Sequence, residues 1–390
     1  MFEGMKSMND IKKEERPFYR KKRFLWGGIA ALLALAVLLT GLVMIFTAAP
    51  TVYSFGGARL REDVYSYWFS CYKYVYQVNY RDLDIEDSEA GWAQPYRDGM
   101  SYEELFRERI DERIRLRFIA ASLFDSQGYT LSESDREALD ALMEELETES
   151  FGEVPLDVLE KTYGIGKNAV KQAALYEQKY EALYKQLFSD ASVIYSDAYR
   201  DALKSFYETY YLRYNCILIK DDAGDAQISA LEAALFPADG ARVTEETFTA
   251  LEAEYTDENF KVTSGNYPNG IYLYAGESYA RSFDAELLSA FSEAAGSDGI
   301  GKIVKKRNAE DNGTYYVMRY ALDDAPYLLD EKWVDVCFGD LPSYAGIAFY
   351  HDLLREELAS LKTHEAHANH SVANAVSCKY YNIVQLLGND

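Results

Sequence analysis

Residues 24–46 form an unbroken run without a charged side chain, and they directly follow the basic residues 20–23. A helix rises about 1.5 Å per residue, so roughly 20 residues cross the ~30 Å hydrocarbon layer of a membrane. Basic residues next to such a span stay on the cytoplasmic side. The sequence therefore predicts a cytoplasmic basic tail over 1–23, a transmembrane helix over 24–47, and an extracytoplasmic remainder.

The alternative interpretation of this run is a cleaved secretion signal, whose apolar core is usually only about 7 to 15 residues long. The run here is longer, and the small residues 47–49 lead straight into Pro50, which is a poor context for cleavage. No Cys directly follows the run to carry a lipid anchor. A retained single-pass anchor in the cell membrane is the favoured interpretation.

The chain is acidic, with 40 Lys and Arg against 64 Asp and Glu and a formal net charge of −24. The tail carries eight basic and four acidic residues, so the part after Arg23 keeps 32 basic and 60 acidic residues, a net charge of −28. Such a surface repels polyphosphates and anionic headgroups, which argues against a nucleic-acid partner. A surface that only keeps the protein soluble is the simpler interpretation.

The extracytoplasmic part is longer than one hydrophobic core usually serves, so two domains are expected. The four cysteines are far apart and include no C-x-x-C pair: Cys71, Cys216, Cys337 and Cys378. Two bridges in any of three pairings are possible, but a domain of this size does not need them. We predict mostly free thiols and no metal site among them.

Residues 50–209 have a predominantly helical pattern. A short strand over 51–55 ends at a Gly-Gly turn, a helix over 61–80 follows, and the acidic stretch 82–100 is typical of a loop. From Ser101 the apolar residues recur every four positions, which predicts a helix to about Gly128. Ser132 and Asp135 have the spacing of a reciprocal N-terminal cap for a helix to about 149, and a third helix begins near Lys167.

The pattern changes at Tyr210. A β-rich run over 212–220 is followed by helical patterns over 226–236 and from Thr244, a loop over 265–270, a helix over 284–295 and a strand over 315–320. This order predicts a compact α+β domain over 210–325. The apolar helical pattern over 341–361 predicts that a C-terminal segment, 326–390, packs back on the helical domain, which makes the α+β domain an insertion.

Several segments resemble one known group of proteins. Residues 123–135 and 163–165 carry patterns common to its helical domain. Residues 216–219 read Cys-Ile-Leu-Ile where a parvulin has His-Ile-Leu-Ile, 248–257 resemble its helix ending in Tyr-Ser-Asp, and 315–318 resemble its last strand. In this order the chain resembles extracytoplasmic foldases of the PrsA/SurA group, with a SurA-type chaperone domain and a parvulin-type peptidyl-prolyl isomerase domain.

The resemblance implies a catalytic groove whose residues are changed. The two histidines that the family pairs beneath its groove fall at Cys216 and Tyr316. Asp257 ends the matching helix, and the next position, where the family has an acid or Cys near the substrate bond, is Glu258. Prolyl isomerisation has a barrier of about 18 to 20 kcal/mol, which an enzyme lowers by holding the twisted amide in a dry, shaped groove. These four residues are the candidate catalytic site of a degenerate isomerase groove.

The resemblance thus predicts an α+β protein that acts as a membrane-anchored extracytoplasmic chaperone or foldase for non-native secreted polypeptides, with a weak or inactive isomerase domain and no cofactor. Two alternatives stay open. One is an active peptidyl-prolyl isomerase that uses the changed groove. The other is a cell-envelope scaffold that docks one folded partner.

A histidine cluster and a glycine-rich stretch allow other interpretations. His364, His367 and His370 recur every three residues, with His351 upstream, but without a carboxylate or Cys partner a surface role is favoured over metal binding. The stretch over 164–167 lacks the spacing of a phosphate loop. The sequence contains no motif that supports hydrolysis.

Overall fold

The computed structural model describes residues 50–79, 84–97, 99–148, 156–258, 260, 267–274, 283–295, 299–308, 310, 312–364 and 370–379. None of the helices in these ranges is both long and apolar enough to cross a membrane. The predicted tail over 1–23 and the predicted transmembrane helix over 24–47 lie outside the described residues.

The described residues form two compact units. The first contains residues 50–111, 143–173 and 361–379, and the second contains 112–142 and 174–360. These limits fall inside three helices, so they do not test the domain boundaries predicted at residues 209 and 325, which remain predictions.

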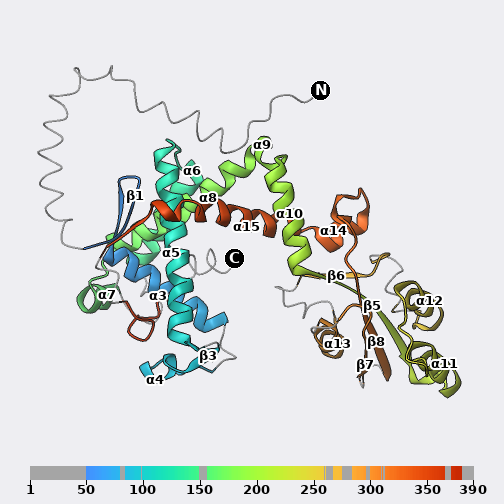
Figure 1. Cartoon of the computed structure of the whole chain (residues 1–390). Helices are drawn as coiled ribbons and strands as arrows, with labels where there is room; N and C mark the ends of the chain where they lie inside the picture. The colour runs from blue at the N-terminus through green and yellow to red at the C-terminus, as the bar shows by residue number, and fades with distance from the viewer. Residues whose placement is uncertain are drawn as a thin grey trace, which may run out of the picture. The chain divides into compact units, whose positions relative to one another are not determined.

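The elements up to the start of the sheet domain are mainly helical (Figure 1). They are β1 (Thr51–Phe55), β2 (Ala58–Arg61), α3 (Glu62–Asn79), α4 (Glu89–Trp92), β3 (Pro95–Arg97), β4 (Met100–Ser101), α5 (Tyr102–Ser126), α6 (Glu133–Thr148), α7 (Leu156–Tyr163), α8 (Lys167–Ser189), α9 (Ala191–Ile194) and α10 (Asp197–Tyr210).

The remaining elements alternate between strands and helices. They are β5 (Tyr211–Lys220), η3 (Asp221–Ala223), α11 (Asp225–Leu235), α12 (Glu245–Tyr255), β6 (Ile271–Tyr274), α13 (Ala285–Ala295), β7 (Ile303–Asn308), β8 (Gly313–Tyr320), η4 (Pro326–Leu328), α14 (Lys332–Phe338), α15 (Leu341–Arg355), η5 (Leu358–Ser360) and β9 (Lys362–Thr363).

The local signals in the helical part are confirmed. The N–H of Asp135 donates to Ser132 Oγ at 3.1 Å, and the N–H of Ser132 donates to Asp135 Oδ2 at 3.2 Å, so the predicted reciprocal cap begins α6. Gly56 and Gly57 adopt φ of 57° and 96°, which close β1 and β2 into a hairpin.

Two expectations about element limits are wrong, and one short helix, α9, was not predicted. The predicted loop over 82–100 contains α4 and the short hairpin of β3 and β4. A break at Asp190, whose side chain accepts from the N–H of Ser192, starts α9 after α8. The predicted helix over 341–361 ends at Arg355, and η5 follows.

The second unit contains a four-stranded antiparallel sheet in the order β6-β5-β8-β7. Helices α11 and α12 lie on one side of the central strands β5 and β8, and α13 lies on the other (Figure 1). Their apolar side chains pack against the two faces of these strands. Because both faces are buried, β5 is apolar along most of its length. Helices and a small antiparallel sheet together confirm the predicted α+β class.

The parts of α5 and α8 that belong to this unit pack together, and α15 packs against α8. The hydroxyl of Tyr350 donates to the carbonyl of Tyr180 at 3.0 Å, and a Cβ at Gly346 would lie 2.8 Å from the Tyr184 hydroxyl, so α8 and α15 approach closely. Arg117 Nε lies 2.8 Å from Glu177 Oε2, and each side chain is only 1% exposed. This ion pair joins α5 to α8 inside the core.

We predict that Glu177→Gln lowers the free energy of unfolding by about 3 kcal/mol, because removing one partner leaves the other charge buried and uncompensated. Urea denaturation of the full chain measures this change. Asp197→Asn, which removes an exposed ion pair with Arg200 in the same unit, is the control and should cost under about 0.5 kcal/mol. Equal effects of the two substitutions would contradict the role of the buried pair.

Candidate functional site

The structure does not bring Cys216 and Tyr316 together. In the antiparallel pair of β5 and β8, Cys216 lies opposite Val317, and Ile217 lies opposite Tyr316. Successive side chains of a strand point to opposite faces, so Cys216 and Tyr316 lie on different faces of the sheet. Cys216 packs in the core beneath α13, whereas Tyr316 packs beneath α11.

On β8, Tyr315 and Val317 share a face with Cys216, and Tyr315 carries the polar group. Its hydroxyl donates to the carboxylate of Asp284, and Asn308 Nδ2 donates to both the Tyr315 hydroxyl at 3.1 Å and Asp284 Oδ2 at 3.2 Å. The other oxygen of Asp284 accepts from the N–H of Leu287 at the start of α13. The sequence analysis did not predict this polar cluster. The only signal was the alternation of side chains along the strand, because a shift of one residue in the alignment moves the candidate side chain to the other face of the sheet.

The chemistry of these side chains favours packing over catalysis. Cys216 is fully buried, and burial, reinforced by the carboxylates of Asp284 and Glu252, raises the pKa of its thiol. Burial and the hydrogen bond to Asp284 likewise raise the pKa of Tyr315. Both groups are therefore neutral at physiological pH, and Cys216 offers no thiolate nucleophile.

Tyr316 has a separate set of partners on the other face. Its hydroxyl donates to Glu232 Oε1 on α11 at 2.6 Å, and Lys305 of β7 pairs with the same carboxylate. Burial, followed by the hydrogen bond to Glu232, raises the pKa of Tyr316. These contacts attach α11 to the edge of the sheet.

The two acidic candidates follow α12. The N–H of Asp257 donates to the carbonyl of Leu218 at 2.9 Å, and its carboxylate lies 4.0 Å from Lys220 Nζ. Glu258 is exposed. Asp257 therefore anchors the end of α12 to β5, and the roles predicted for Asp257 and Glu258 in a groove remain predictions.

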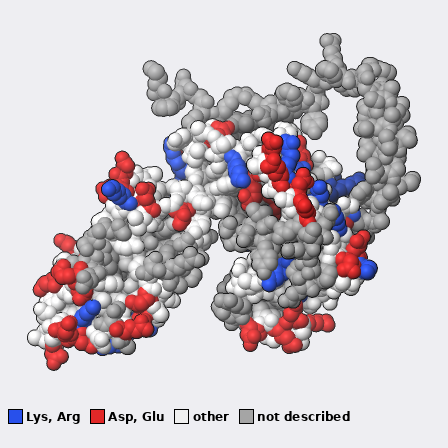
Figure 2. All heavy atoms as spheres, turned by 180° about the vertical axis from the view of Figure 1, so that it is seen from behind, with Lys and Arg blue, Asp and Glu red and all other residues white. Residues whose placement is uncertain are grey.

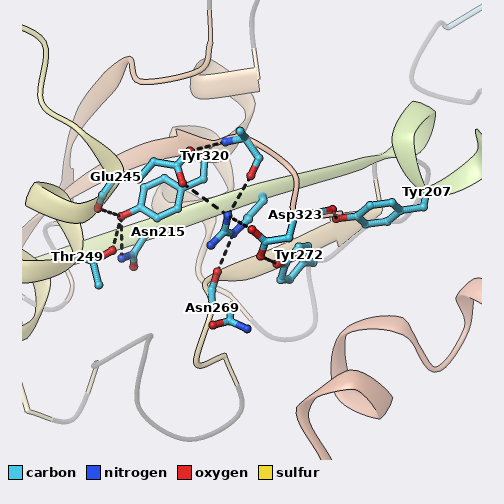
Figure 3. A network of polar contacts seen from close by, with 10 residues as sticks. Tyr207, Asn215, Glu245, Thr249, Asn269, Tyr272, Tyr320 and Asp323 are labelled. Carbon is cyan, nitrogen blue, oxygen red and sulfur yellow. Dashed lines mark hydrogen bonds and ion pairs between the residues drawn. The ribbon is translucent and has the colours of Figure 1, made fainter. Parts of the chain in front are cut away.

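A polar network centred on Arg213 connects β5 to the loop before β6, the loop after β8 and the start of α12 (Figure 3). Its Nε donates to the carbonyl of Asn269 at 2.7 Å, and its Nη1 donates to the carbonyl of Ala321 at 3.0 Å and to Asp323 Oδ1 at 2.8 Å. Glu245 Oε2 on α12 lies 3.6 Å from the same nitrogen. The guanidinium thereby fixes the loops at the ends of β6 and β8.

Three tyrosine hydroxyls extend this network. Tyr272 of β6 donates to the Asp323 carboxylate, Tyr207 of α10 donates to the Asp323 carbonyl at 3.1 Å, and Tyr320 of β8 donates to the Glu245 carbonyl at 3.0 Å (Figure 3). Burial, followed by the contacts with Asp323, raises the pKa of Tyr272 and of Tyr207. Each phenol thus stays a neutral donor.

A cavity of about 150 Å³ lies where α14 packs beside β6, which is an edge strand of the described four-stranded sheet. Five of its lining residues are aromatic: Tyr211, Tyr267, Tyr272, Phe283 and Tyr344. The rest are Ile271, Leu273, Asp335, Val336, Cys337, Gly339 and Asp340. A void of this size accommodates one ring or one long side chain. Sequence reasoning did not predict this site.

Three of the four histidines hydrogen-bond to neighbouring hydroxyl groups. His364 contacts Ser54, His370 contacts Ser66 and His351 contacts Tyr180, each through Nε2. His367 lies outside the described residues. Within the described ranges, no group of three or more His, Cys, Asp or Glu residues has the arrangement of a metal site.

No protein-family model matches the chain, and no curated protein matches it significantly. Solved structures of the foldase protein PrsA do match. That of Streptococcus pneumoniae is 18% identical, and the match covers 71% of this chain and 97% of that one with a TM-score of 0.23. PrsA of Lactococcus lactis is 12% identical, and the match covers 82% of this chain and 96% of that one with a TM-score of 0.22. PrsA of Bacillus subtilis is 15% identical, and the match covers 78% of this chain and 98% of that one with a TM-score of 0.21. At such TM-scores these matches establish no shared function.

We predict that the sheet core loses stability above about pH 10 because its phenols titrate. Burial raises the pKa of Tyr214 to about 12, so above pH 10 the unfolded chain, but not the folded chain, releases this proton. The stabilising contribution is complete below pH 10 and falls by about 1.4 kcal/mol by pH 11. Urea midpoints at pH 9 and pH 11 measure the loss.

Tyr214→Phe is the matched variant, because it keeps the ring that packs against Phe291 and removes the titrating group. The variant should lose about 1.4 kcal/mol less than the unchanged chain between pH 9 and pH 11. An identical pH dependence in both proteins would contradict the prediction.

Proposed function

We propose that this protein is a membrane-anchored extracytoplasmic chaperone or foldase that binds non-native secreted polypeptides, and that its parvulin-like domain is weak or inactive as a prolyl isomerase. The observation that carries the proposal is the aromatic cavity between β6 and α14. Rigid aromatic rings with a polar tip provide apolar contact without demanding one specific sequence. Weak binding to many polypeptides needs such a surface.

Exposed apolar side chains at α14 extend this surface. Val336, which lines the cavity, is 50% exposed, and Leu328 and Leu329 at η4 are 73% and 49% exposed. Helix α14 packs against η4. Exposed large apolar groups at a cavity and on a neighbouring element are typical of a binding surface for another polypeptide.

The acidic surface supports a holding role. Asp and Glu side chains are spread over the face of the molecule that Figure 2 shows, and the whole chain has a net charge of −24. A high net charge keeps a protein soluble, and it has the same effect on a complex with an aggregating polypeptide. The predicted anchor over 24–47 would hold this surface at the membrane.

The contacts of the changed groove residues support weak or absent isomerase activity. Cys216 is buried with a neutral thiol, and on the other face of the sheet the Tyr316 hydroxyl donates a hydrogen bond to Glu232. Catalysis of isomerisation needs groups that stabilise the twisted amide better than the planar one. Side chains that already satisfy one another cannot move toward a substrate without losing those contacts.

We predict that the full chain, held in lipid nanodiscs, slows the aggregation of a chemically unfolded client at about a one-to-one ratio. Light scattering after dilution of the client from denaturant measures the rate, with empty nanodiscs as the blank. The double variant Leu328→Ser and Val336→Ser should lose much of this effect because it removes apolar contact area.

Ile194→Ser is the control for this experiment, since it changes an exposed apolar residue that does not line the cavity. An unchanged aggregation curve with the full chain would overturn the chaperone proposal. Cross-linking then distinguishes the scaffold alternative, which requires one stoichiometric folded partner in place of many unrelated unfolded chains.

We also predict no rate of prolyl isomerisation above the uncatalysed background in a peptide assay. The uncatalysed reaction takes about 10 to 100 s at 25 °C, so even modest catalysis would be detected. A rate that exceeds background and falls in both Cys216→Ala and Tyr316→Phe would instead support the active-isomerase alternative.

A further inference from the structure

The rim of the aromatic cavity carries two carboxylates. Asp335 lies in α14, and Asp340 lies just before α15. Both residues are exposed, and their side chains form no ion pair or hydrogen bond with any residue that the structure describes. The cavity therefore combines an aromatic wall with negative charge that the protein itself does not neutralise.

Aromatic faces and carboxylates together are complementary to one chemical group, a cation on an apolar stem. The ring quadrupole attracts a Lys or Arg head, and the methylene stem packs on the ring. The same part of the molecule already uses this contact internally, because the guanidinium of Arg213 lies 5.7 Å from the centre of the Tyr272 ring. An acidic side chain of a bound polypeptide would be repelled by these carboxylates, and a neutral polar side chain would gain no attraction between opposite charges.

We propose that the cavity binds the side chain of a Lys or Arg residue in a non-native polypeptide. This inference rests on the proposed chaperone function and specifies its ligand. The ammonium or guanidinium group lies between the carboxylates of Asp335 and Asp340, and the stem lies against Tyr344 and Tyr267. The volume of about 150 Å³ admits one such side chain, so each binding event engages a single basic residue.

The test uses the full chain in nanodiscs and three labelled peptides of nine residues with blocked ends. The peptides are identical except at the central position, which is Lys, norleucine or Glu. Fluorescence anisotropy at low salt should give the Lys peptide an affinity about fivefold higher than the norleucine peptide, and the Glu peptide the weakest. The preference for Lys should shrink in high salt, because the carboxylates are exposed.

Asp335→Asn together with Asp340→Asn should abolish the preference for Lys and leave the norleucine peptide unaffected. Asp330→Asn is the matched control, since Asp330 is an exposed carboxylate that precedes α14 and does not line the cavity. Equal affinities for Lys and norleucine, or a preference that survives the double substitution, would overturn the proposal.

Cys337 reports on the location of the bound peptide. Its half-buried thiol lines the cavity, and burial raises its pKa to about 11. Alkylation at pH 9, followed by mass spectrometry, should be several-fold slower at Cys337 when the Lys peptide is bound. Unchanged alkylation under saturating peptide would show that the peptide binds elsewhere.

The outcomes separate this inference from the function on which it rests. Suppressed aggregation without a preference for Lys would leave the chaperone proposal intact and remove the cation site. A Lys preference at this cavity without suppression of aggregation would keep the site and remove the chaperone role.

Discussion

The guanidinium of Arg213 fixes the part of the second unit on which the proposed binding site depends. It contacts the segments before β6, after β8 and at the start of α12, through Asn269, Asp323 and Glu245. A largely buried charge is tolerable only when such partners replace its water. Tyr272 donates to the same Asp323 and lines the cavity, so the position of the aromatic wall follows from this one cation.

Tyrosine side chains are frequent both in the core and in the wall of the cavity. A buried hydroxyl without a partner costs about 1 to 3 kcal/mol, so an acceptor for a buried phenol stabilises the fold. Tyr207, Tyr272 and Tyr320 each have such an acceptor within the Arg213 network. These three tyrosines thus supply apolar area while their hydroxyls cross-link segments that are far apart in the chain.

Much of the fold could be predicted because its signals are local. The capped start of α6 and the buried strand β5 depend on neighbouring residues, and both were predicted from the sequence. Strand β6 has only four residues and β7 reads Ile-Val-Lys-Lys-Arg-Asn, so neither has a pattern that distinguishes it from a loop. Their pairing is decided by contacts with β5 and β8.

The site was harder to predict than the fold. A one-residue difference in alignment exchanges Tyr316 for Tyr315, and because side chains alternate, that difference moves the candidate from one face of the sheet to the other. The cavity could not be predicted either. Its walls come from residues 211 to 344, and only the tertiary packing of α14 beside β6 brings them together.

The two candidate sites on the sheet differ in whether their polar groups are already used. Beneath α13, Tyr315, Asp284 and Asn308 bond to one another, so a substrate would have to replace contacts that stabilise the fold. At the rim of the cavity, Asp335 and Asp340 are exposed carboxylates, and binding a cation there breaks no contact among the described residues. The free energy of binding is the gain from new contacts minus the cost of the contacts that binding breaks. Among the described residues, the cavity beside β6 is therefore a better place for the proposed binding than the polar cluster beneath α13.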